Sequence, residues 1–119
     1  MRSDREKLQD ILGAIDRIEQ YAQGGKGIFE GNDLIQSGVL YQLIVIGEAA
    51  GDLSSDLREQ YPLIPWKPII GMRNFVAHEY FRVDLEIVWA VVERELPRLK
   101  SQVEKILQEY QPIEQEEID

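Results

Sequence analysis

Two residues in one short stretch, Arg73 and His78, carry side chains that could act together on a phosphodiester, and a tyrosine, Tyr80, follows the histidine by two positions. An arginine presents a fixed fork of N–H donors that matches phosphate oxygens, and a histidine can take or give a proton near neutral pH. Cleaving RNA without a metal requires a base for the 2′-hydroxyl, an acid for the 5′-oxygen and a cation for the charge that develops on the phosphorane. Arg73 and His78 therefore form a candidate pair for metal-independent RNA cleavage.

His78 is the only histidine in the chain, which limits what one copy can do. One imidazole supplies only one of the two proton transfers at a time, whereas a two-fold dimer would bring two copies of His78 and Arg73 to one cleft. We therefore expect a homodimer. The structural alternative is that His78 is a helix-end histidine with satisfied partners and that Tyr80 is a core aromatic.

Other site chemistries find little support. The chain has no cysteine, which excludes disulfides, thiolate metal sites and cysteine nucleophiles. It contains no HxH or HExxH pair and no GxSxG motif, so neither a histidine-based zinc site nor a serine hydrolase is indicated. We predict no bound metal and no cofactor.

The candidate residues are expected on a helix that begins near Pro65, since proline is tolerated in a first helical turn. Residues five apart on a regular helix diverge by about 140°. We therefore expect a break near Ala77 or His78, which would let the histidine turn back toward Arg73. One face of this helix is predicted to hold an apolar stripe that includes the arginine: Trp66, Ile69, Ile70, Arg73 and Ala77.

The remaining pattern predicts more helices and no strands. Apolar residues recur at helical spacing after a cap at Ser3 or Asp4 as far as residue 22, and again from a cap at Asn32 or Asp33 to Ala50. The glycine-rich stretch 24–27 is expected to end the first of these helices. A short helix is predicted from residue 54 or 55 to residue 60, and a long one from a cap at Asp84, bent or split at Pro97.

These helices predict an all-α bundle of four to five helices with a kinked long C-terminal helix. We assign residues 1–110 to this one domain and residues 111–119 to an acidic, disordered tail. Glu48 lies at the small-residue end of the second long helix. It is either a solvated helix-end acid or a partner that supports Arg73.

Net charge is −9 with a pI near 4.6, which argues against a broad nucleic-acid surface. The segment 58–82 is mildly basic, because four basic side chains there face two acidic ones. A small phosphate-binding cleft is therefore permitted. No apolar run approaches a membrane span and no signal-peptide core follows the charged N-terminus, so we expect a cytoplasmic protein without membrane contact.

Residues 73–80 read RNFVAHEY, which resembles the R-x4-H-x-Y signature of the HEPN ribonucleases, specifically the HepT-like toxin family. Asn74 supplies the polar residue that usually follows the arginine. Four further stretches are similar to that family in the same order: VIGEAA (45–50), YPLIPW (61–66), IIGMRN (69–74) and VDLEIVW (83–89). Together the patterns span about residues 39 to 99.

The resemblance implies a dimeric helical bundle that acts as a toxin of a toxin–antitoxin system, an RNA endonuclease with Arg73 and His78 catalytic. It also implies a partner, a nucleotidyltransferase antitoxin of the MntA kind, which transfers AMP from ATP to the motif tyrosine, here Tyr80. The alternative is a non-catalytic helical subunit that binds substrate or nucleotide for a minimal nucleotidyltransferase.

Overall fold

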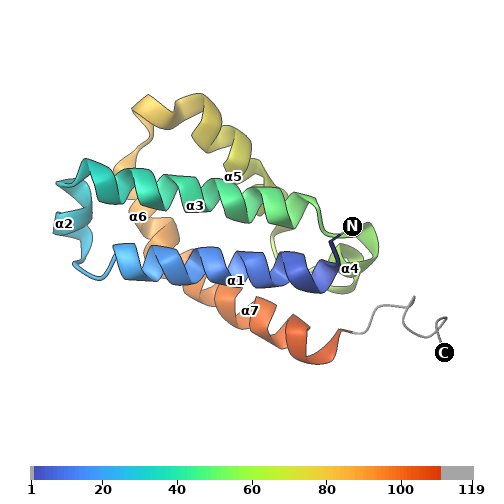
Figure 1. Cartoon of the computed structure of the whole chain (residues 1–119). Helices are drawn as coiled ribbons and strands as arrows, with labels where there is room; N and C mark the ends of the chain where they lie inside the picture. Colours follow the sequence, from blue (N-terminus) through green and yellow to red (C-terminus); the bar gives the residue numbers. More distant parts are fainter. Residues whose placement is uncertain (1, 111–119) are drawn as a thin grey trace, which may run out of the picture.

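The computed structural model describes residues 2–110, which form an all-α bundle without strands in that range (Figure 1). Three long helices are separate elements, α1 (Asp4–Tyr21), α3 (Asp33–Gly51) and α5 (Trp66–Glu79). A fourth long run passes from α6 (Leu85–Ala90) through a π-helical segment, η2 (Val91–Glu95), into α7 (Leu96–Glu109). Two short helices, α2 (Lys26–Glu30) and α4 (Ser55–Gln60), lie at opposite ends, and a 3-10 turn, η1 (Tyr80–Arg82), follows α5. The predicted all-α bundle is confirmed, while the predicted tail 111–119 lies outside the described residues.

Helix α3 is the centre of the bundle, with α1 along one side and α5 along the other (Figure 1). Its buried residues include Val39, Leu43 and Ile46, and it makes its most extensive contacts with α1 and α5. By length and composition alone α3 could also cross a membrane, but 44% of that window is buried inside the bundle. Its composition therefore matches that of a core helix.

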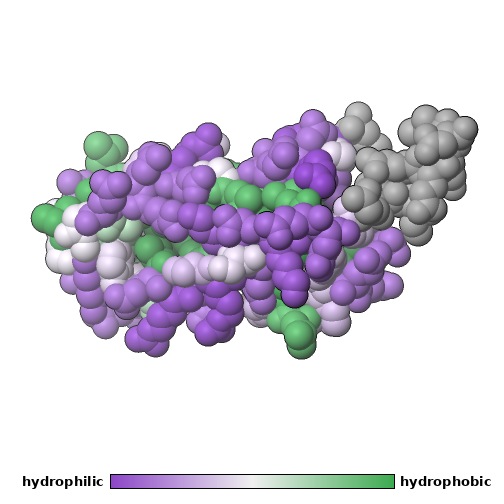
Figure 2. Space-filling model, turned by 90° about the horizontal axis from the view of Figure 1, so that it is seen from below, coloured by the Kyte–Doolittle hydropathy of each residue, from purple (hydrophilic) through white to green (hydrophobic). Residues whose placement is uncertain are grey.

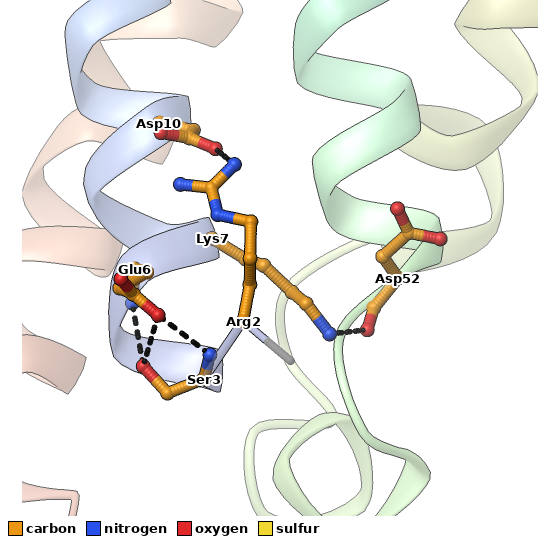
Figure 3. A network of polar contacts seen from close by, with 6 residues as sticks. All are labelled: Arg2, Ser3, Glu6, Lys7, Asp10 and Asp52. Carbon is orange, nitrogen blue, oxygen red and sulfur yellow. Dashed lines mark hydrogen bonds and ion pairs between the residues drawn. The ribbon is translucent and has the colours of Figure 1, made fainter.

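Polar caps fix where the helices begin. The Ser3 hydroxyl accepts the Glu6 N–H, while the Glu6 carboxylate accepts the Ser3 N–H at 2.9 Å (Figure 3). The Ser3 backbone N–H, and then its hydroxyl, lower the pKa of the Glu6 carboxyl because they favour its ionised form. Lys7 donates to the Asp52 carbonyl at 2.6 Å, which ties α1 to the end of α3. Of the alternative caps predicted for α1 and α3, the structure shows Ser3 and Asn32, and the predicted cap Asp84 is observed. The predicted short helix begins at Ser55, with Ser54 as its cap.

The C-terminal helix departs from the prediction in how it accommodates Pro97. Proline lacks an N–H and clashes with the carbonyl four residues before it. The chain does not split there. It widens into the π-helical segment just before the proline, where the Leu96 N–H bonds to the Val91 carbonyl.

On the side of the bundle where α7 lies, seen from below, hydrophilic side chains cover most of the surface (Figure 2).

Helix α2 was not expected, because its glycine-rich start indicated only the end of α1. The turn is made possible by Gly25, whose φ of 88° is rarely adopted by other residues. Phe29 then anchors the short helix. It is 1% exposed, and its ring centroid lies 5.4 Å from that of Trp89. A single buried aromatic therefore explains a helix that periodicity cannot reveal in so few residues.

Candidate active site

Helix α5 presents the motif at the surface of the bundle. Its buried residues are Trp66, Ile69 and Val76, which pack toward the core. The predicted apolar stripe is therefore correct at Trp66 and Ile69 and wrong at Ala77, which is exposed. Arg73 is exposed as well. His78 is also exposed, so both candidate side chains of α5 are accessible to solvent.

A close crossing of α3 and α5 sets the position of Arg73. A Cβ atom added to Gly47 would lie 2.9 Å from the Arg73 backbone nitrogen and 3.1 Å from the Ile69 carbonyl oxygen. Only a glycine permits this approach without a shift of one helix. This approach brings the backbone of Arg73 directly against α3.

Glu48, the next residue of α3, forms an ion pair with Arg73, and the Nε–Oε1 distance is 2.5 Å. Of the two interpretations left open by the sequence, the structure shows the pairing. Both side chains are about half exposed, so the pair contributes little to stability. Its effect is on orientation, because the Nε contact fixes the plane of the guanidinium and leaves its terminal N–H groups available.

Asn74 supports the same side chain. Arg73 Nη1 donates to Asn74 Oδ1 at 3.2 Å. A carboxylate on α3 and an amide on α5 therefore hold the guanidinium from two directions. An arginine positioned in this way, on a regular helix, can present a fixed set of donors to an external phosphate.

His78 is exposed in the last turn of α5. Within residues 2–110 its side chain makes no hydrogen bond or ion pair, so the interpretation of His78 as a satisfied helix-end histidine is not supported. The expected break at Ala77 or His78 is wrong by one to two residues, since α5 remains helical through Glu79 and the 3-10 turn follows. Arg73 and His78 therefore diverge by about 140° around the helix axis, and no hydrogen bond joins them in the described part of one chain.

Tyr80 lies on the 3-10 turn and not in the core. Its hydroxyl donates to the Ser37 hydroxyl on α3 at 3.0 Å, and the residue is 37% exposed. Its ring meets that of Phe81 edge-on, with centroids 5.4 Å apart. Both aromatics line a pocket of about 410 Å³. The phenol oxygen is thus held near the surface by one weak neutral hydrogen bond.

Two residues of this region were missed by the sequence prediction. Ser37 gave no signal, because its contact with Tyr80 depends on how α3 and α5 cross. Phe81 is 96% exposed, and its position directly after the motif was the only available hint. Within residues 2–110 no three acidic or histidine side chains gather as potential metal ligands.

Comparison with known proteins gives a consistent result. The family described as Ribonuclease HepT-like matches residues 11–106 of this chain. A protein of Methanocaldococcus jannaschii, provisionally named an RNase, is 38% identical over 98 residues, which cover 82% of this chain and 90% of that relative. A Thermococcus cleftensis protein named "Probable ribonuclease HepT" is 34% identical over 108 residues, covering 88% and 96%. A relative from Caldanaerobacter subterraneus, also provisionally named an RNase, is 39% identical over 114 residues, covering 91% and 97%. No solved structure matches the chain.

Proposed function

The chain belongs to the HepT-like ribonuclease family, and on that premise we propose that it is the toxin component of a toxin–antitoxin system, an RNA endonuclease that cuts without a metal ion. The observation that carries the proposal is the fixed Arg73 guanidinium, held at the surface by Glu48 and Asn74. A pre-oriented cation of this kind stabilises charge that develops on a phosphate without reorganising during the reaction.

The proposed reaction is transfer of the phosphodiester to the 2′-oxygen. A base removes the 2′-hydroxyl proton, the 2′-oxygen forms a bond to phosphorus, and the bond from phosphorus to the 5′-oxygen breaks as that oxygen gains a proton. The products are a 2′,3′-cyclic phosphate and a 5′-hydroxyl. His78 carries the proton transfers, and Arg73 binds the non-bridging oxygens, where negative charge increases.

The single-chain geometry supports a homodimer as the active unit. Arg73 and His78 point away from each other around α5, so both can reach one phosphate only if a second copy faces the first. Helix α5 and the turn after it also expose two aromatic side chains, Phe75 at 46% and Phe81 at 96%. Exposed aromatic side chains beside functional polar groups are typical of a surface that is covered in an assembly.

Silencing of the toxin would occur at Tyr80. We propose that a nucleotidyltransferase antitoxin transfers AMP from ATP to this residue: the phenol oxygen attacks the α-phosphate, pyrophosphate leaves, and the phenol proton is released. The position of Tyr80 at the surface, two residues after His78, supports this role. The adenylate adds bulk and negative charge beside the site that would receive RNA phosphate.

Expression in a bacterial host without the antitoxin tests the proposal. The wild-type chain should arrest growth, whereas Arg73→Ala and His78→Ala should each relieve the arrest at equal protein level. An Arg17→Ala variant, altered at an exposed arginine of α1, serves as control and should remain toxic. A non-toxic wild-type chain would favour the alternative of a non-catalytic binding subunit.

The Tyr80 assignment has a separate test. Incubation with a nucleotidyltransferase antitoxin of the MntA kind and ATP should add AMP mass to the peptide that contains Tyr80. Tyr80→Phe should abolish that modification, while Tyr41→Phe, at a tyrosine of α3 that is 61% exposed, should not. Equal modification of the Tyr80→Phe protein at another site would contradict the assignment.

A further inference from the structure

A second pocket lies one helical turn before Arg73, between α4 and the first half of α5. Its volume is about 520 Å³. Two cations line it, Arg58 from α4 and Lys67 from α5, together with the Ser55 hydroxyl and one carboxylate, Glu59. We call it the α4–α5 pocket. Its two cations and one carboxylate give it a net charge of +1 in a protein whose net charge is −9. The rest of its lining is apolar: Pro62, Trp66 and Ile70.

Neither cation of the α4–α5 pocket is neutralised within the described residues. Arg58 Nε is shielded from solvent and has no hydrogen-bond partner there. Lys67 is exposed and forms no ion pair in residues 2–110. A donor removed from water without an acceptor is unfavourable. The Lys67 ammonium and the terminal N–H groups of Arg58 are therefore left without an ion-pair partner in the described chain.

The face of α5 that carries Lys67 also carries two residues of the candidate active site. Lys67, Asn74 and His78 follow one another at helical intervals of seven and four residues, which places them within about 40° of one another around the axis. From Lys67 to His78 the helix rises about 16 Å. An extended strand could therefore lie along this face, with one phosphate in the pocket and another near His78.

We propose that the α4–α5 pocket is a phosphate subsite for the RNA strand that flanks the bond to be cut, with Arg58 and Lys67 as its ligands. The inference rests on the proposed ribonuclease function and adds how an acidic protein holds its substrate. Two cations that line one pocket can bind a backbone phosphate without reading base sequence. Glu59, in the same pocket, weakens that binding, so its removal should act in the opposite direction from the removal of the cations.

Binding is measured in the His78→Ala background, by fluorescence anisotropy of a labelled single-stranded RNA over a range of salt concentrations. Arg58→Gln/Lys67→Gln keeps part of each side-chain stem and removes both charges. It should weaken binding about tenfold and reduce the slope of log affinity against log salt by about 0.7, the contribution of the one phosphate contact that is lost. The matched control is Arg17→Gln/Arg94→Gln, at two exposed arginines that also form no ion pair in the described chain.

The carboxylate provides a gain-of-affinity test that unfolding cannot imitate. Glu59→Gln should tighten RNA binding about twofold to fivefold, whereas Glu104→Gln, at an exposed acid of α7, should change it less. The subsite would be overturned if the Arg58/Lys67 and Arg17/Arg94 double variants lost RNA affinity equally. It would also be overturned if Glu59→Gln did not increase RNA affinity.

Cleavage separates the subsite from the catalytic proposal. With His78 intact, Arg58→Gln/Lys67→Gln should lower kcat/KM about tenfold on a long RNA and leave cleavage of a dinucleotide unchanged, because a dinucleotide has no flanking phosphate. An equal loss on both substrates would mean that the pocket acts through the fold or through Arg73, which would overturn the inference. A wild-type chain that cuts neither substrate would instead contradict the ribonuclease proposal.

Discussion

Helices α5 and α7 have the same length, 14 residues each, and use their surfaces in opposite ways. Helix α7 buries one regular stripe, Leu96, Leu99, Val103 and Ile106, and keeps its other faces polar. Its Lys100 is paired with Glu19 and Asp16 of α1. The buried stripe of α7 and its paired Lys100 thus find their partners within the chain.

Helix α5, by contrast with α7, exposes an aromatic side chain and a histidine to solvent. It buries Trp66, Ile69 and Val76 and exposes Phe75, although phenylalanine is usually buried. It also exposes His78 without a polar contact in the described chain. A helix that buries its apolar stripe against its own chain contributes mainly to stability. A helix that exposes aromatic and titratable side chains together indicates a functional surface.

The largest expected effect on stability is at the buried stripe of α7. Ile106 of α7 is 1% exposed, so Ile106→Ala should lower the free energy of unfolding by about 2–5 kcal/mol through lost burial and the cavity left behind. Phe81→Ala, beyond the end of α5, should lower it by less than about 0.5 kcal/mol in the monomer. Denaturant titration at low protein concentration measures both. Similar losses of unfolding free energy for the two variants would contradict the distinction between the buried stripe of α7 and the exposed turn after α5.

Gly47, where α5 crosses α3, should show the next largest effect. The new methyl group of Gly47→Ala would meet backbone atoms of Arg73 and Ile69 at about 3 Å, so one helix must shift, at a cost of about 1–3 kcal/mol. RNA cleavage should fall as well, because Arg73 moves with its helix. Gly71→Ala is the control, since its Cβ meets nothing within 4 Å. It should stabilise the protein by about 0.5–1 kcal/mol.

The helices themselves could be predicted because caps and periodicity are local properties. Ser3, Asn32, Ser54 and Asp84 each follow the pattern of a helix N-cap, and all four act as caps. Helix α2 and the π-helical segment could not be predicted in this way. The first depends on the burial of Phe29, and the second on how the chain relieves the clash caused by Pro97.

The candidate site was predictable as a set of residues but not as a geometry. The types and spacing of Arg73 and His78 indicated their chemistry, and Glu48 was one of two open alternatives for an anionic partner. The contact of Ser37 with Tyr80 depends on the crossing of α3 and α5, which no local pattern encodes. The expected break at Ala77 or His78 was wrong because nothing in the local sequence ends the helix before Glu79.

Helices α5 and α7 each carry a partly exposed ion pair to a neighbouring helix, Arg73–Glu48 and Lys100–Glu19. Removing one charge from each pair tests the difference between the two helices with little change in stability. Glu48→Gln should cost about 1 kcal/mol or less in stability, yet lower the rate of RNA cleavage about tenfold, since Arg73 loses the contact that orients it. Glu19→Gln, which weakens the pairing of Lys100 with α1, should leave the cleavage rate unchanged. Equal rates for the two variants would show that the Glu48 contact does not position Arg73.

The smallest effect is expected at the cap of α1. The pKa of Glu6 is lowered in the folded state by its hydrogen bonds from Ser3, so the contribution of its carboxylate is present above the unfolded-state pKa and is lost as the pH falls through the folded-state pKa. Glu6→Gln keeps an acceptor but removes the charge. Thermal melts should show a slightly less stable variant at neutral pH and no difference in acid. A difference that grows on acidification would contradict this sign.

The central claim is that His78 carries proton transfer in RNA cleavage without a metal ion. The most direct test is cleavage of single-stranded RNA by purified protein in the presence of a chelator. We expect the wild-type protein to remain active and His78→Ala to lose at least about a hundredfold in rate, with helical content, dimer formation and RNA affinity retained. Cleavage by His78→Ala at the wild-type rate would contradict the account.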